Sequence, residues 1–262
     1  MVGAILAVDL LERQSRYGCL KIRWSAPSAP WRTCTLGGMG YDDLPRLLGL
    51  LTGDEKHSGA AASTLDVLWV LYDRVLAVSP ATTDDPARDR FLLSKGHGPM
   101  AFYAVLAAKG FIPETALPGF GGFESDLGHH PDRNHIPGVE IASGSLGHGL
   151  PLAVGRVLAL DYRGQSGARV FVLVGDAELD EGTNHEAIAY AGRAGLERLT
   201  VVAIDNQSSS HGWPGGIEAR FAVEGWSTAV CDGRDHDAIE RGLTQLHPGR
   251  PHVVVAHVEE GS

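Results

Sequence analysis

The sequence has few cysteines and no long apolar run. Its three cysteines, Cys19, Cys34 and Cys231, lie far apart and form no Cys-x-x-Cys pair. This spacing excludes a thiolate zinc site and a disulfide scaffold, and it is typical of a reducing cytosol. The segment Val2–Val8 is apolar, but no basic residue precedes it, which argues against a signal peptide. No run approaches the roughly 20 apolar residues of a membrane span. We therefore expect a cytoplasmic protein that does not enter a membrane.

Basic residues are also scarce. Lysine and arginine number 22 against 32 aspartates and glutamates, so the formal net charge is −10. This excess of negative charge argues against a nucleic acid or an anionic membrane as partner, because both require a basic face. An anionic ligand would have to be held by backbone dipoles, a metal ion or a few local cations. The abundant residues are instead glycine, with 34, and histidine, with 12.

The chain divides into two parts at about residue 40. Residues 1–40 sustain no helical period and contain the proline-rich stretch Trp24–Trp31. We expect an N-terminal extension there that is poorly ordered or holds a short strand at Tyr17–Trp24. In residues 41–262 we expect helices over 44–51, 65–76, 99–109, 146–162, 181–194 and 235–246, strands over 169–174, 199–204, 226–231 and 252–258, and a long loop over 111–143. This alternation predicts an α/β domain whose parallel sheet has helices on both faces.

Two oxygen-bearing side chains follow consecutive strands of this predicted sheet. Asp176 comes directly after one strand, and Asn206 follows the next, 30 residues later. That separation is one helical crossover, so the two side chains should face each other at adjacent strand ends. Carboxylate and amide oxygens suit Mg²⁺ or Ca²⁺, and such a metal could hold a diphosphate on an acidic protein. The alternative is a capping aspartate and a turn asparagine, both frequent at strand ends.

Several motifs, in order along the chain, resemble those of the transketolase family of thiamine-diphosphate-dependent enzymes. The resemblance rests on His57–Gly59, Leu93–Gly98, Gly128–Asp132, Pro137–Glu140, Gly144–Gly149, Gly175–Gly182, Glu186-Ala187 and Asp205-Asn206. It covers more than four-fifths of the chain, from about Tyr41 onward. It implies the thiamine-diphosphate-binding fold, and within it the domain that binds the diphosphate.

The resemblance also implies roles for individual residues. Mg²⁺ or Ca²⁺ would be held by Asp176, Asn206 and the backbone carbonyl of Ser208. The cofactor would contact Gly144, Ser145, Leu146, Gly147, Gly175, Asp176, Ala177, Glu178 and Asn206. The histidines lining the cofactor and substrate channel would be His57, His97, His130 and His257, with imidazole suited to proton transfer near neutral pH. Glu181 and Glu186 would lie at a subunit interface.

Some residues depart from the family pattern or have another explanation. Ala177 stands where the family usually has glycine, His148 stands where it often has glutamine, and Ser210–Gly212 replaces its Ile-Asp-Gly. Extra imidazoles at His148 and His211 would tune substrate choice. Without the resemblance, hydrogen bonding of a loop to its own backbone would explain His57 and His97 equally well.

The resemblance implies a divided active site. In this family the glutamate that acts on the aminopyrimidine, and the basic residues that grip a sugar phosphate, belong to a second, pyrimidine-binding domain. The sequence ends soon after the last expected strand. We therefore expect a split transketolase subunit, working in an α₂β₂ assembly with a pyrimidine-domain subunit to move a two-carbon ketol unit from a ketose donor to an aldehyde acceptor. The alternatives are the α subunit of another thiamine-diphosphate enzyme (a 2-oxo acid dehydrogenase or a decarboxylase) and a non-catalytic regulatory homologue.

Overall fold

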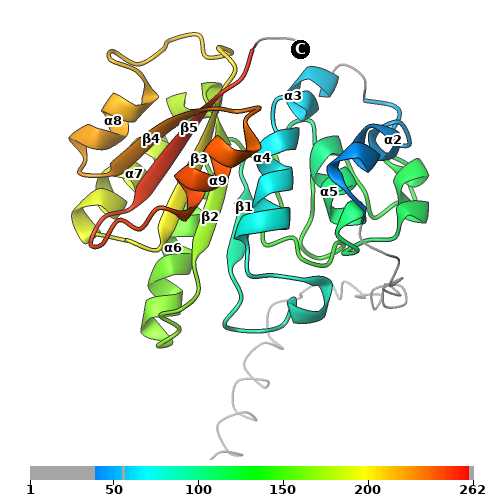
Figure 1. Cartoon of the computed structure of the whole chain (residues 1–262), viewed down its shortest axis with the longest axis horizontal. Helices are drawn as coiled ribbons and strands as arrows, with labels where there is room; N and C mark the ends of the chain where they lie inside the picture. Colours follow the sequence, from blue (N-terminus) through cyan, green and yellow to red (C-terminus); the bar gives the residue numbers. More distant parts are fainter. Residues whose placement is uncertain (1–38, 55–56, 260–262) are drawn as a thin grey trace, which may run out of the picture. The chain divides into compact units, whose positions relative to one another are not determined.

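The computed structural model describes residues 39–54 and 57–259, which contain one mixed α/β domain. Its centre is a five-stranded sheet in the order β1-β2-β3-β5-β4, and every neighbouring pair is parallel (Figure 1). The strands are β1 (Arg90–Leu93), β2 (Val170–Gly175), β3 (Leu199–Asp205), β4 (Ser227–Asp232) and β5 (His252–His257). The predicted parallel sheet is confirmed. The extension predicted for residues 1–40, with its short strand, lies almost wholly outside the described residues.

Helices cover both faces of the sheet, because alternate strand residues pack into two separate apolar cores. Phe171 and Leu173 of β2 join the core that contains α2 (Leu44–Leu48), α4 (Leu65–Val70), α5 (Met100–Ala108) and α9 (His236–Thr244). Val172 and Val174 point the other way and join α6 (Gly149–Tyr162), α7 (Gly182–Ala194) and α8 (Ile217–Val223). Burial on both faces explains why β2 reads as a continuous apolar run.

The remaining elements are short helices at the ends of longer ones or inside loops. They are α3 (Ser58–Ala62), the 3₁₀ helices η2 (Tyr41–Asp43), η5 (Pro80–Thr82), η6 (Glu114–Gly119) and η7 (Ala177–Asp180), and a π-helical turn, η4 (Leu71–Val75). The helix predicted over 146–162 begins three residues late, at Gly149, because Gly144 and Gly147 adopt positive φ angles of 123° and 82°. Among the strands and α-helices of the described residues, β1, α3 and α8 were not predicted.

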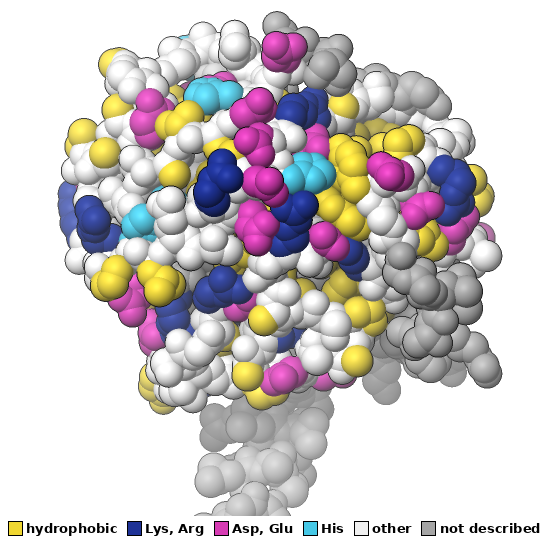
Figure 2. Space-filling model, viewed as in Figure 1, with side chains coloured by type: hydrophobic (Ala, Val, Ile, Leu, Met, Phe, Trp, Pro, Cys, Tyr) yellow, Lys and Arg dark blue, Asp and Glu magenta, His cyan; other side chains and the backbone are white. Residues whose placement is uncertain are grey.

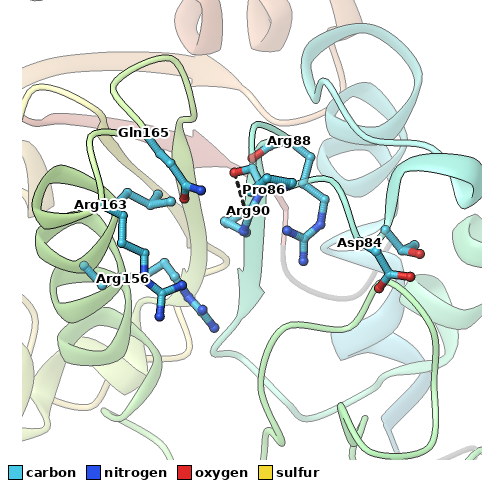
Figure 3. A pocket seen from close by; sticks show the side chains of 10 residues that line it. Asp84, Pro86, Arg88, Arg90, Arg156, Arg163 and Gln165 are labelled. Atoms are coloured by element: carbon cyan, nitrogen blue, oxygen red, sulfur yellow. Dashed lines mark hydrogen bonds between the residues drawn. The ribbon is translucent and has the colours of Figure 1, made fainter. Parts of the chain in front are cut away.

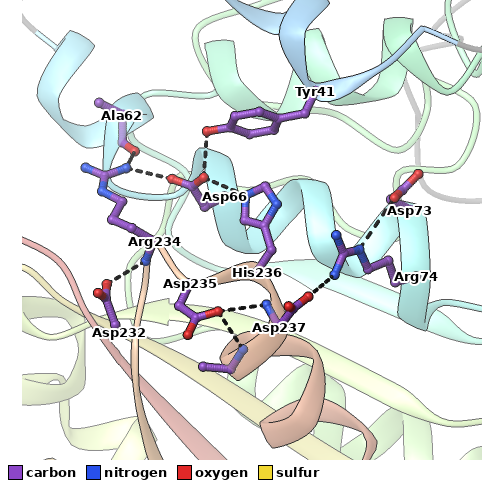
Figure 4. Close-up of polar contacts among 11 residues, drawn as sticks. Tyr41, Ala62, Asp66, Asp73, Arg74, Asp232, Arg234, Asp235, His236 and Asp237 are labelled. Carbon is purple, nitrogen blue, oxygen red and sulfur yellow. Dashed lines mark hydrogen bonds and ion pairs between the residues drawn. The ribbon is translucent and has the colours of Figure 1, made fainter.

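A buried carboxylate ties two of the helices together. Asp66 of α4, with 5% of its surface exposed, accepts hydrogen bonds from Tyr41 (2.6 Å), Arg234 (2.8 Å) and His236 (2.8 Å) (Figure 4). Burial alone would raise the pKa of Asp66, but these three donors together hold it below its ordinary value. On the molecular face that carries α4 and α9, acidic and basic side chains lie next to each other (Figure 2). The cations there are therefore matched by carboxylates.

No helix in the described part of the chain is both long and apolar enough to cross a membrane.

The parallel strands give the sheet two different edges. We use carboxyl edge for the side where the strands end and amino edge for the side where they begin. Ligands of parallel sheets bind beyond the carboxyl edge.

Candidate functional site

Most of the predicted site residues lie where the strands end. Ser94–Gly98 follows β1, Asp176 follows β2, Asn206 follows β3, and His257 is the last residue of β5. All the strands are parallel, so these four exits lie at the same edge of the sheet. The sequence prediction that Asp176 and Asn206 occupy adjacent strand ends is consistent with this, since β2 pairs directly with β3.

Asp176 is the central anchor of the carboxyl edge. Its residue is 2% exposed, and its Oδ1 accepts hydrogen bonds from the backbone N–H of Ala177 (2.8 Å) and the hydroxyl of Ser208 (2.6 Å). Its Oδ2 accepts from the backbone N–H groups of Ser208 (2.6 Å) and Ser209 (3.1 Å). A carboxylate offers about four lone pairs, so these donors use all of them. Asp176 thereby fastens the loop after β3 to the end of β2.

Asn206 carries an oxygen that the described residues leave unpaired. Its Oδ1 is buried, and no hydrogen-bond donor in residues 39–54 or 57–259 reaches it. A buried carbonyl oxygen without a partner is unfavourable by about 1–3 kcal/mol, and such atoms usually face an ion or water. The next residue, Gln207, has a φ of 59°, a conformation that non-glycine residues rarely adopt. The loop therefore holds an unpaired amide oxygen at the strand end next to that of Asp176.

These residues fit a divalent cation. Within the described ranges, no three His, Cys, Asp or Glu side chains are placed to hold a metal ion. A cation here would use one carboxylate, one amide oxygen and a backbone carbonyl, the oxygen set that Mg²⁺ and Ca²⁺ accept. It would replace at least one of the four donors on Asp176. In the structure, the N–H and the hydroxyl of Ser208 both donate to that carboxylate.

A second buried carboxylate braces the turn at Gly144–Gly149. Oε1 of Glu178 accepts from the hydroxyl of Ser94 and from the N–H of Gly147 (2.9 Å), and its Oε2 accepts from the N–H of Gly175 (3.3 Å). The Ser94 oxygen in turn accepts from the N–H of Gly149 (3.0 Å). Burial raises the pKa of Glu178 above its ordinary value, although these donors and Lys95 oppose the shift. Glu178 thus connects the exits of β1 and β2 with the turn.

The glycines of this turn are required by close contacts within the protein. A Cβ at Gly144 would lie 2.9 Å from Cδ2 of His130, and one at Gly147 would lie 2.6 Å from Cβ of Glu181. Both residues also have positive φ angles. Thr183 holds the turn from the other side, because its hydroxyl donates to the carbonyl of Gly147 at 2.7 Å. A side chain at either glycine would displace the turn.

Three histidines form a chain of rings beside this turn. The ring centroids of His57 and His97 are 5.8 Å apart, and those of His97 and His130 are 5.7 Å apart. Nδ1 of His57 lies 2.7 Å from Oδ1 of Asp54. Burial lowers the pKa of His97, and the neighbouring His130 and His57 lower it further, so His97 is mainly neutral at pH 7. A neutral imidazole can accept a proton from a bound hydroxyl.

Comparison with known proteins agrees with this geometry. Residues 51–258 match the family described as transketolase, thiamine diphosphate binding domain. Over 213 residues the chain is 37% identical to one subunit of the apulose-4-phosphate transketolase of Actinobacillus succinogenes, covering 79% of this chain and 77% of that protein. The chain belongs to the transketolase family. The fold agrees as well, since the transketolase from Leishmania mexicana superposes with a TM-score of 0.70 at 24% identity, over 84% of this chain and 37% of that one.

Another relative has a different name. The chain is 56% identical over 222 residues to the protein named ferredoxin fas2 of Rhodococcoides fascians, covering 85% of this chain and 73% of that protein. Ferredoxin clusters are held by four cysteine thiolates, and this sequence has three cysteines in all. The three cysteines of this chain are therefore too few to hold such a four-thiolate cluster.

Some residues expected from the transketolase resemblance lie apart from the histidine chain. His257 lies at the carboxyl edge, but its Nδ1 pairs with Oδ2 of Asp205 at 3.0 Å rather than with another histidine. Ser145 is exposed, and its hydroxyl lies 3.0 Å from Nδ1 of His148. Glu181 and Glu186 are exposed at the start of α7 and within it. Leu146 lies half-buried in the turn.

The sequence reasoning gave no role to Ser94 or Lys95, although both belong to the Ser-Lys-Gly-His motif. Lys95 is 9% exposed, and its Nζ donates to the carbonyl of Ala60 (3.2 Å) and the hydroxyl of Ser63 (3.3 Å). Burial lowers its pKa to about 8, while Asp176 and Glu178 act in the opposite direction. Lys95 therefore supplies the positive charge that accompanies the two buried carboxylates. Its position inside the Ser-Lys-Gly-His motif was the feature of the sequence that could have pointed to this role.

Proposed function

We propose that this chain is the diphosphate-binding subunit of a two-component transketolase, which moves a two-carbon ketol unit from a ketose donor to an aldehyde acceptor. The observation that supports it best is the convergence of four strand exits on one edge of the sheet. That edge brings together the Gly144–Gly149 turn, Asp176, the unpaired oxygen of Asn206 and three histidines. Each group suits one part of a thiamine diphosphate site.

Different residues of this chain would bind the metal ion and the diphosphate. Asp176, Asn206 and the carbonyl of Ser208 would hold Mg²⁺ or Ca²⁺, and the backbone around Gly144–Gly147 and Gly175–Glu178 would face the diphosphate. Thiamine diphosphate, when bound, supplies a carbon nucleophile that also accepts electrons as the donor is cleaved. Glu178 contributes indirectly, because it fixes the turn that presents the backbone N–H groups.

The histidines would accept protons from the substrate and donate protons to it. Neutral His97 can accept a proton from a ketose hydroxyl, and His57, held by Asp54, can donate to or accept from an adjacent oxygen. His130 continues the row and touches the glycine turn. His257 would reach the channel from the end of β5. A row of imidazoles favours polyhydroxylated substrates over simple 2-oxo acids, and so favours a transketolase over a decarboxylase.

The remaining half of the site would come from a partner subunit. The chain spans about a third of the length of the Leishmania transketolase but about three quarters of the Actinobacillus transketolase subunit. Its proposed partner is a subunit with the pyrimidine-binding domain, in a cytoplasmic α₂β₂ assembly. The exposed carboxylates of Glu181 and Glu186 lie on the α7 surface proposed to meet a second copy.

Reconstitution tests the proposal. The purified chain is mixed with a candidate pyrimidine-domain subunit from the same organism, Mg²⁺, thiamine diphosphate and a panel of ketose donors that includes xylulose 5-phosphate, fructose 6-phosphate and apulose 4-phosphate. We expect aldehyde release only when both chains are present. The variant His97→Asn should lose most activity while keeping cofactor binding, whereas the control His247→Asn, at the amino edge, should remain active.

Two results would refute the proposal. Donor cleavage by this chain alone would show that its active site needs no partner subunit. Absence of cleavage by a stable complex with bound cofactor, across the whole donor panel, would contradict the transketolase activity and favour a regulatory role or another thiamine-diphosphate reaction.

A further inference from the structure

A second polar pocket lies at the amino edge of the sheet, away from the strand exits. It has a volume of about 320 Å³ and is formed by the start of β1, the end of α6 and the loop that leads into β2 (Figure 3). Its polar lining includes Thr83, Arg88, Arg90, Arg156, Arg163 and Gln165. We call it the arginine pocket.

The arginine pocket gathers positive charge on an otherwise acidic chain. Four arginines line it, yet one carboxylate, that of Glu140, serves three of them. Glu140 lies 2.5 Å from Nη2 of Arg88, 3.5 Å from Nη2 of Arg156 and 3.8 Å from Nε of Arg90. Asp84 also lines the pocket, and Asp89, which is itself paired with Arg169, acts on Arg90, so four guanidinium groups meet at most three carboxylates there. Positive charge in the arginine pocket therefore exceeds the negative charge that could neutralise it.

Two of the four arginines, Arg88 and Arg90, are held by contacts within the protein; Nη2 of Arg88 donates to Glu140. Arg90 is 5% exposed and donates to the carbonyls of Arg88 and Pro86, the latter at 3.0 Å, so it shapes the wall rather than reaching for a ligand. Burial lowers its pKa, and the adjacent guanidinium groups of Arg88 and Arg156 add to that effect. Among the residues that the structure describes, the Arg156 side chain has a single polar contact, the 3.5 Å ion pair with Glu140.

Other donors also lack partners. Across residues 39–54 and 57–259, the side chain of Arg163 makes no hydrogen bond or ion pair, and neither the hydroxyl of Thr83 nor the amide of Gln165 is bonded. A guanidinium group has five N–H donors in a planar fork that matches phosphate oxygens. The pocket therefore presents two arginine forks with open donors, together with a hydroxyl and an amide.

We propose that the arginine pocket binds a small phosphorylated metabolite, with Arg156 and Arg163 on the phosphate and Thr83 or Gln165 on its hydroxyl or carboxylate groups. The volume is at the lower end of the range for small-molecule sites, which suits a phosphate ester of about three carbons. Bidentate guanidinium contacts favour phosphate over a monovalent anion. The site is independent of the proposed cofactor site, because it opens at the other edge of the sheet.

The test is calorimetric titration of the full chain with 3-phosphoglycerate and with inorganic phosphate. Saturating thiamine diphosphate and Mg²⁺ are present, and the titration is repeated on Asp176→Ala, so that binding at the carboxyl edge is excluded. We expect one 3-phosphoglycerate per chain, weakened at least 5-fold by Arg163→Gln and by Arg156→Gln. Glycerate, which lacks the phosphate, should not bind measurably. Arg250→Gln, an exposed arginine outside the pocket, is the matched control.

The affinities of the variants for 3-phosphoglycerate decide whether the proposal holds. Arg163 is exposed and has no partner to lose among the described residues, so Arg163→Gln should fold normally even if Arg156→Gln does not. Equal weakening by Arg250→Gln would show non-specific charge attraction and overturn the proposal. So would unchanged binding in Arg163→Gln, or no binding at millimolar 3-phosphoglycerate.

Discussion

The two edges of the sheet offer an anion different chemistry. At the carboxyl edge, Asp176 and Glu178 are buried carboxylates, and the nearby Lys95 is buried with a lowered pKa of about 8. At the amino edge, Arg156 and Arg163 hold guanidinium donors toward an open pocket. Without a bound metal ion, the carboxylates at the carboxyl edge would repel a phosphate group. The arginines at the amino edge would attract it without the help of a metal.

This difference explains how an acidic family member can bind a diphosphate. At the carboxyl edge, the proposed metal ligands follow the strand ends directly, and Glu178 holds the glycine turn in place. The amino edge relies on long side chains from separate segments. We therefore expect binding at the carboxyl edge to depend on metal and backbone geometry, and binding at the amino edge to depend on side-chain charge.

The largest effect should come from Asp176→Ala. Removing this carboxylate deletes the proposed metal ligand and frees four donors of the surrounding loops. We expect thiamine diphosphate affinity to fall by at least 100-fold, about 2.7 kcal/mol, while affinity for 3-phosphoglycerate stays within 2-fold. Calorimetry with each ligand measures both. Retention of thiamine diphosphate by this variant would contradict the assignment of Asp176.

A glycine at each edge provides the next comparison. Gly147 and Gly164 both have positive φ, at 82° and 68°, but only Gly147 would place a Cβ against another residue. Gly164→Ala should cost about 1 kcal/mol of unfolding free energy, from backbone strain alone. Gly147→Ala should cost about 2–3 kcal/mol, since Glu181 and Thr183 must also move. Urea denaturation monitored by circular dichroism gives both values, and equal costs would show that the turn is not tightly packed.

The smallest effect concerns pH and a histidine at the amino edge. His252 is 3% exposed and stacks on His247 with a 4.0 Å centroid separation, and burial lowers its pKa to about 4. The unfolded chain binds this proton near pH 6.5 and the folded chain does not, so stability falls as pH drops from about 6.5 to about 4. Between pH 6.5 and 5 the loss should be about 1–2 kcal/mol.

The variant His252→Gln isolates that contribution. It lacks the titrating group, so its unfolding free energy should fall less steeply over the same pH interval. Chemical denaturation at four pH values measures the slope. Identical slopes in the two proteins would mean that His252 titrates normally in the folded state.

The sequence predicted the parts of the fold that have a long pattern. Strands β2, β3 and β5 are continuous apolar runs separated by helical segments. This pattern predicted where the strands lie in the chain and that they form a parallel sheet. Strand β1 was missed because four residues, Arg90–Leu93, are too short to show a period. Helix α8, with seven residues, was missed for the same reason.

The placement of two candidate site residues at adjacent strand ends could be predicted from chain order. Asp176 and Asn206 follow consecutive strands, which placed them at one edge, and the remaining site residues came from motifs. The inward-facing side chain of Glu178 could not be predicted, because its partners Ser94 and Gly147 come from two distant segments. The arginine pocket was not predicted either. Its residues belong to no motif and meet only because α6 packs beside β1 and β2.

The most direct test of this account is one titration of the wild-type chain with thiamine diphosphate and 3-phosphoglycerate, before and after removal of divalent metal with EDTA. The account predicts that EDTA abolishes thiamine diphosphate binding, that added Mg²⁺ restores it, and that 3-phosphoglycerate binding is the same throughout. Thiamine diphosphate binding that survives EDTA, or loss of both ligands together, would contradict the claim that the two edges hold phosphate by different chemistry.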